Sequence, residues 1–265
     1  MSAKSHHRKP HGQAAHEKIV APKQTLEEMM QSREADVLRA AASHPGMNED
    51  LALLFLTRRD LPPAALEALS KNGHAMKHRR VLAAIVAHVK TPRHVSLPIA
   101  RHLYTFELLQ IALTPAVPAD VKMAVEDAIA MRLESISAGE RLALAKRGST
   151  RIAAALLLDK EPAVMQAALV NPFMTEVWIV KAIMSKDATP ALVSEVAHHV
   201  KWSLRKEIRV ALLKNDMTPL GRVLAFAQSM SAPVLREVLA TSRLSAKVKE
   251  YLTKELENRK SYQLS

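Results

Sequence analysis

The hexapeptide Asn171-Pro172-Phe173-Met174-Thr175-Glu176 has a counterpart, His44-Pro45-Gly46-Met47-Asn48-Glu49, which lies 127 positions earlier in the chain (171 − 44). The same offset relates Thr91-Pro92 to Thr218-Pro219. Apolar residues between these prolines keep the spacing of one helix face. Helical segments that recur at a fixed offset are typical of an α-solenoid, in which each unit packs only against its neighbours. We therefore expect an all-α fold, a right-handed α-solenoid with an internal duplication.

The offset divides the chain into blocks. The first repeat block covers residues 38–129 and the second covers residues 165–256, again 127 apart (165 − 38). Residues 130–164 form a middle unit that is too apolar for a flexible linker. We expect residues 25–265 to form a single solenoid domain.

The first 24 residues are basic and contain almost no strong hydrophobes, so we expect a disordered tail. Histidine-rich tracts can bind metal, but unanchored histidines more often only solvate a tail, and we predict no metal site there. The four histidines are His6, His7, His11 and His16.

Composition limits the possible functions. The chain contains no cysteine, which excludes disulfides, thiol catalysis and cysteine-ligated metals. No stretch offers the ~20 apolar residues of a membrane span, and the N-terminus lacks the apolar centre of a secretory signal. We expect a soluble, cytoplasmic protein. Its formal net charge of +12 favours association with nucleic acid or anionic surfaces but does not define the fold.

Helix boundaries can be predicted from the capping residues. Thr25 with Glu28, and Ser137 with Glu140, have the spacing of a capping box. Asn48 is expected to cap the helix that follows it. In the Thr-Pro pairs, we expect threonine to cap the incoming helix and proline to occupy its first turn. Asn171 and its counterparts are expected only to close the outgoing helix.

The phrase from Val164 to Glu176, and its echo from Ile208 to Pro219, resembles the bacterial leucine-rich repeat variant, a family similar to HEAT repeats. The resemblance implies alternating helices separated by Asn-Pro and Thr-Pro turns. It covers about half of the chain in short motifs. It carries no catalytic residue, and the cysteine-bound cluster of the family's type member has no ligands here.

Basic residues recur near expected helix starts. Cations there oppose the helix dipole, whereas a bound anion would reverse the sign of that interaction. The alternative is a solvated face on a basic protein. The candidate anion-binding or nucleic-acid-binding residues are Lys77, His78, Arg79, Arg80, Lys146, Arg147, Arg151, Lys201, Trp202, Arg205 and Lys206.

The two tryptophans allow a sharper hypothesis. Some HEAT-like DNA glycosylases place exposed tryptophans beside a displaced base. Trp178 occupies the position of Leu51 in the first block, so we expect it to pack in the core. Trp202 follows Lys201 in an expected loop and is the better candidate for exposure.

No catalytic or cofactor motif is present, and we predict no catalytic residue, no cofactor and no enzyme activity. The recurring Asp60 and Asp187 each precede a helix, where the helix dipole accounts for them. We expect a non-enzymatic scaffold that binds a protein partner, in an oligomeric state that the sequence does not reveal. The alternative is a nucleic-acid-binding or DNA-repair module that uses a basic groove.

Overall fold

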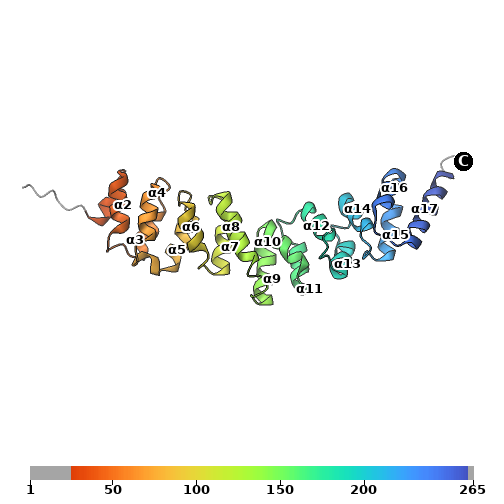
Figure 1. Ribbon diagram of the computed structural model, residues 1–265, viewed down its shortest axis with the longest axis horizontal. Coiled ribbons are helices and arrows are strands. Elements are labelled where there is room, and N and C mark those ends of the chain that lie inside the picture. The colour runs from red at the N-terminus through yellow and green to blue at the C-terminus, as the bar shows by residue number, and fades with distance from the viewer. Residues whose placement is uncertain (1–24, 262–265) are drawn as a thin grey trace, which may run out of the picture.

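The computed structural model describes residues 25–261, and side chains up to residue 257, as helices joined by short turns. This described part contains no strand. The helices follow one another in chain order along the long axis of the molecule (Figure 1). The expected all-α class is confirmed. The predicted tail, residues 1–24, lies outside the described residues.

The first half contains α1 (Leu26–Gln31), α2 (Ala35–Ser43), α3 (Glu49–Leu56), α4 (Pro63–Ser70), α5 (Arg79–Ala87), α6 (Arg93–Ala100), α7 (Thr105–Leu113) and α8 (Ala119–Ala130), with a 3-10 turn, η1 (Ala75–Lys77), before α5. The second half contains α9 (Ala138–Arg147), α10 (Thr150–Ala155), η2 (Leu156–Leu158), α11 (Pro162–Leu169), α12 (Glu176–Ile183), α13 (Pro190–His198), α14 (Lys206–Lys214), α15 (Leu220–Gln228), α16 (Ala232–Thr241) and α17 (Ala246–Ser261).

Helices pack in two rows of alternating members. From α6 to α16, each even-numbered helix contacts the next even-numbered one, and α2 contacts α4 in the same manner. Among the odd-numbered helices, α3, α5 and α7 are in successive contact, as are α9, α11 and α13. Their apolar faces form one cluster of buried residues that extends from Met30 to Leu256. Small aliphatic side chains dominate it, which permits close approach of helices.

The sequence offset coincides with helix starts. Each helix from α2 to α8 begins 127 residues before a helix from α11 to α17, as in α5 at Arg79 and α14 at Lys206 (206 − 79). Because α9 and α10 lie between the two sets, each helix and its counterpart are nine places apart in the helix order. One label of each pair is therefore even and the other odd. Corresponding helices therefore belong to opposite rows.

Predicted caps are confirmed at three helix starts. Thr25 and Glu28 form a reciprocal capping box, as do Ser137 and Glu140. The Asn48 side chain accepts a hydrogen bond of 2.9 Å from the Leu51 N–H. Each cap satisfies N–H groups that a first helical turn leaves without intrahelical partners.

The expectation for the Thr-Pro pairs was wrong in three of four cases. Thr114, before Pro115, is the C-cap of α7, and its hydroxyl donates to the Gln110 carbonyl at 2.7 Å. The hydroxyls of Thr91 and Thr218 donate, at 2.6 Å each, to the Ile85 and Leu212 carbonyls of the outgoing helix. The following prolines are themselves the N-caps. Only Thr189 caps the incoming helix, through a bond of 3.2 Å from the Leu192 N–H. A threonine six residues beyond a free helix carbonyl can fold back to it, and here this contact occurs in place of the cap.

The asparagines do more than close a helix. The Asn171 amide donates to the Ala145 and Gly148 carbonyls at 2.7 and 3.1 Å, two helices earlier, while its oxygen accepts from the Phe173 N–H at 2.8 Å. Asn215 similarly donates to the Ile183 carbonyl at 2.7 Å. We call the turns after odd-numbered helices the first edge and those after even-numbered helices the second edge. Side-chain bonds of this kind link turns along both edges.

No helix among the described residues is both long and apolar enough to cross a membrane.

Polar groups inside the stack are paired. In the described part of the chain, no buried side-chain nitrogen or oxygen lacks a hydrogen-bond partner. The interior therefore holds no unsatisfied polar atom that would itself indicate a ligand.

Candidate functional site

Arg79, the first residue of α5, is occupied by an intramolecular partner. Its guanidinium donates to both carboxylate oxygens of Glu107 on α7, at 3.0 and 2.5 Å, and to the His102 carbonyl at 3.2 Å. The guanidinium carbon also lies 3.4 Å from the centre of the Tyr104 ring. The hydrogen bond from Arg79 holds the pKa of Glu107 below its ordinary value. This cation is already neutralised and oriented within the fold.

The neighbours of Arg79 share another carboxylate. Glu49, at the start of α3, lies 3.2 Å from His78 Nδ1 and 3.7 Å from an Arg80 nitrogen. Lys77 is exposed and has no ion pair within the described part of the chain. Three of the four predicted residues in this group therefore contact acidic side chains on adjacent helices.

The predicted residues of the middle unit lie in different surroundings. Lys146 and Arg147 are exposed in the last turn of α9, where positive charge favours the helix dipole. Arg151 is in the first turn of α10 and forms an ion pair with Asp127 on α8. The interpretation that all these cations oppose a helix N-terminus therefore does not hold for the α9 pair.

In the second half, Arg205 is the N-cap of α14 and Lys206 is its first residue. Both are exposed, and neither has an acidic partner among the described residues. Lys206 corresponds to Arg79, but the position of Glu107 holds Val234 here (234 − 107 = 127). The Arg79 charge is thus neutralised in the first half, whereas the corresponding Lys206 charge in the second half has no acidic partner among the described residues.

The prediction that Trp202 is exposed was wrong. Its side chain is only 3% exposed, and the indole N–H donates to the Leu169 carbonyl at 2.8 Å. The Lys201 amine lies over the ring, 4.0 Å from its centre. Trp178, expected in the core, is partly buried against it and has Lys181 at 4.8 Å from its ring. Neither indole is a free stacking platform.

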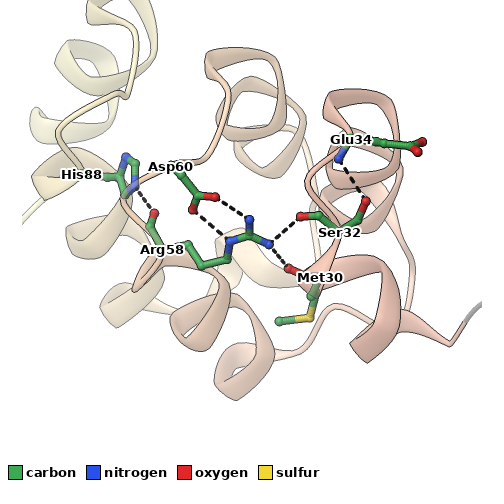
Figure 2. Close-up of polar contacts among 6 residues, drawn as sticks. All are labelled: Met30, Ser32, Glu34, Arg58, Asp60 and His88. Atoms are coloured by element: carbon green, nitrogen blue, oxygen red, sulfur yellow. Dashed lines mark hydrogen bonds and ion pairs between the residues drawn. The ribbon is translucent and has the colours of Figure 1, made fainter.

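Sequence reasoning missed the structural use of arginine. Arg58 donates to Met30 and Ser32 carbonyls at 2.5 and 2.9 Å, while Asp60 accepts from the same guanidinium at 3.0 and 2.7 Å (Figure 2). Its own carbonyl receives the His88 Nε2 at 2.8 Å. These contacts connect three successive turns of the first edge. The Arg-x-Asp spacing was the only available sequence signal.

Sequence reasoning also missed a group of exposed apolar side chains on neighbouring turns. We call them the apolar turn patch: Val170, Phe173, Val177, Val200 and Leu204. They lie in and beside the α11–α12 and α13–α14 turns of the first edge, which the Trp202–Leu169 hydrogen bond connects. The exposed fractions of their side chains run from 53% at Phe173 to 83% at Val200.

The 127-residue offset would have revealed this patch. Each member corresponds to a residue that is polar or lacks a side chain in the first block. The counterparts are Ser43, Gly46, Asp50, Gly73 and Lys77, each obtained by subtracting 127 from the patch residue. A comparison restricted to positions that match between the blocks passes over such differences.

Metal chemistry finds no support in the part of the chain that the structure describes. No group of three or more histidine, aspartate or glutamate side chains is placed to hold a metal ion there. Asp60 forms hydrogen bonds with Arg58, and Asp187 accepts no arginine hydrogen bond among the described contacts.

Comparison with models of known protein families, with curated proteins and with solved structures gave no match.

Proposed function

We propose that this chain is a cytoplasmic, non-enzymatic scaffold that binds a protein partner. Its architecture would be a right-handed α-solenoid made of two copies, α2–α8 and α11–α17, with α9 and α10 between them. The shared offset of helix starts supports the duplication. So does the recurrence of the Thr91 bond at Thr218, with both carbonyl acceptors also 127 apart (212 − 85).

The observation that carries the binding proposal is the apolar turn patch. Apolar side chains that remain exposed do not stabilise the isolated molecule through burial. A cluster of them commonly marks an interaction surface. The first block folds into the corresponding turns with polar residues or glycine at these positions. The fold of the turn therefore does not require the apolar side chains.

A photo-crosslinking amino acid at Val177 tests the proposal in cells that naturally make the protein. We expect a discrete adduct with one other protein, because Val177 is a member of the patch and is 74% exposed. The same substitution at Met131, which is 84% exposed in the turn after α8 on the second edge, is the matched control. Equal labelling at both positions, or no adduct at Val177, would refute binding through this patch.

Nucleic-acid binding is a second proposal, supported by cations that remain exposed without described acidic partners. They are Lys77, Lys146, Arg147, Arg205 and Lys206. It does not include stacking by Trp202, because that ring is buried. Phosphate contacts would make duplex DNA binding fall steeply with salt, and Arg205→Glu with Lys206→Glu should flatten that slope. Unchanged salt dependence in this variant would exclude these two residues from the contact.

A further inference from the structure

The apolar turn patch lies beside positive charge that the second half does not neutralise. In the first half, Glu107 and Tyr104 hold the Arg79 guanidinium. Their counterparts are Val234 and Ser231 (234 − 107 and 231 − 104, both 127). Lys206 consequently has neither a carboxylate nor an aromatic ring to receive it, although it starts α14 as Arg79 starts α5.

More cations lie on the same turn and on the neighbouring one. Lys201 and Arg205 are exposed in the α13–α14 turn, which also carries Val200 and Leu204 of the patch. On the other side of the α11–α12 turn, Lys146 and Arg147 end α9, and Asn171 ties that turn to the Ala145 carbonyl at 2.7 Å.

These turns hold fewer acids than bases. Four acidic residues accompany them: Glu176 at the start of α12, Glu207 after Lys206, Glu195 on α13 beside His199, and Glu126, which accepts a hydrogen bond from Ser149. Five cations stand against them: Lys146, Arg147, Lys201, Arg205 and Lys206. A small excess of positive charge therefore lies beside the apolar surface, whereas the first-block counterparts of Val177 and Val234 are the acids Asp50 and Glu107.

We infer that the apolar turn patch binds an acidic segment of another protein that also carries apolar side chains. This inference rests on the proposed scaffold function and names the chemistry of its partner. The apolar side chains of the segment would cover Val170, Phe173 and Val177, while its carboxylates would pair with Lys201, Arg205 and Lys206. Burial supplies affinity, and charge complementarity supplies orientation and rate of association.

Other occupants fit the surface less well. A second copy of this chain would oppose cations to cations across a symmetric contact. The chain's own first 24 residues are basic, so the same repulsion applies to them. Nucleic acid would use the cations but would gain nothing from aliphatic side chains such as Val170 and Val200. Membrane-surface binding commonly relies on interfacial Trp and Tyr side chains. The patch contains neither: Trp202 of this turn is buried, and the exposed aromatic member is Phe173.

The probe is a displayed library of random linear peptides, selected against the full chain. We expect the enriched peptides to combine Asp or Glu with aliphatic or aromatic residues. The variant Val170→Ser, Val177→Asp, Leu204→Lys places first-block residues in the corresponding turns and should weaken binding at least about tenfold. Circular dichroism and thermal melting verify that this variant remains folded.

Charge is tested separately. Arg205→Glu with Lys206→Glu should weaken the selected peptides and reduce the salt dependence of their binding, because screening is stronger at ~1 M than at ~0.1 M salt. Lys71→Glu, an exposed cation in the turn after α4, is the control and should leave binding unchanged. Equal loss in both charge variants would overturn the assignment of these cations to the site.

Two results would refute the inference while leaving the scaffold intact. One is enrichment of uncharged or basic apolar peptides that still depend on the patch. The other is a protein crosslinked through Val177 whose contact segment lacks carboxylates. Patch-dependent recruitment to vesicles of phosphatidylserine and phosphatidylcholine, or a concentration-dependent dimer abolished by Leu204→Lys, would identify another occupant. Absence of both peptide binding and crosslinking would refute the scaffold itself.

Discussion

Asn171 uses one side chain to stabilise its own turn and to connect it to the preceding unit. Its oxygen accepts the Phe173 N–H, and its amide reaches carbonyls at the end of α9. The side chain is 2% exposed, so water cannot replace these partners. A buried donor or acceptor left unpaired costs about 1–3 kcal/mol.

Asn171→Ala should therefore lower the free energy of unfolding by about 1–3 kcal/mol. Chemical denaturation monitored by circular dichroism measures the change. Gln166→Ala, an exposed substitution on the adjacent α11, is the control and should change stability by less than about 0.5 kcal/mol. Similar values for the two variants would show that the contacts between turns contribute little.

Trp202 illustrates what local sequence cannot reveal. Its position in a turn between two helices was predicted, but its burial depends on the Leu169 carbonyl, 33 positions earlier (202 − 169). In the first half the corresponding carbonyl, Ala42, receives the Asn72 amide at 3.0 Å instead. Two different side chains thus satisfy the same backbone group, and no local pattern connects them.

Single-tryptophan variants should separate the two indoles by fluorescence. Trp178→Phe leaves only Trp202, which should emit at shorter wavelength and resist quenching by iodide, because it is 3% exposed. Trp202→Phe leaves the partly buried Trp178, which should be quenched more readily. The reverse order of quenching would contradict the burial of Trp202.

Asp60 should contribute to the acid sensitivity of the fold. Hydrogen bonding from Arg58 lowers the pKa of this carboxyl from 3.8 to about 2. Because the folded state has the lower pKa, the stabilisation is present above about pH 4 and disappears as the pH falls through 2. Asp60→Asn should reduce the loss of stability in this interval, measured by urea denaturation at each pH. Asp187→Asn, at the corresponding exposed position, is the control and should reduce it less.

At the scale of elements, the sequence predicted the type of structure better than the contacts that hold it. Capping boxes depend on residues three apart, so Thr25 and Ser137 were correctly assigned. Thr91 was not, because its choice between the outgoing and incoming helix depends on which backbone group the turn brings within reach. Contacts between turns, such as those of Arg58, join residues 26 and 28 positions apart and leave no local signature.

The α9–α10 turn depends on the small size of Gly148. A Cβ atom there would lie 2.5 Å from the Leu144 carbonyl oxygen and 2.8 Å from an Ile152 methyl carbon. Gly148→Ala should therefore force the two helices apart and destabilise the chain by about 1–3 kcal/mol. Gly73→Ala, where no atom lies within 4 Å of the added Cβ, is the thermal-melting control. A neutral Gly148→Ala would mean that the turn readily adjusts.

At the scale of the whole molecule, contacts connect neighbouring helices rather than the two ends of the chain. Damage to one end should therefore remain local if the helices form a stack of nearest-neighbour units. Leu235 on α16 is fully buried, and its replacement by alanine should cost about 2–5 kcal/mol within its own region. A protein with one central core would instead lose stability throughout.

Hydrogen exchange measured by mass spectrometry can distinguish these outcomes. In Leu235→Ala we expect faster exchange in α14–α17 and unchanged protection in α2–α8, because the packing of α16 involves α14 and α17. Leu38 on α2 is 2% exposed, and Leu38→Ala should give the mirror-image pattern. Faster exchange should be confined to α2 and the helices around it, α1 to α4. Uniform acceleration along the chain in either variant would contradict a stack, since only a shared core transmits one cavity to every helix.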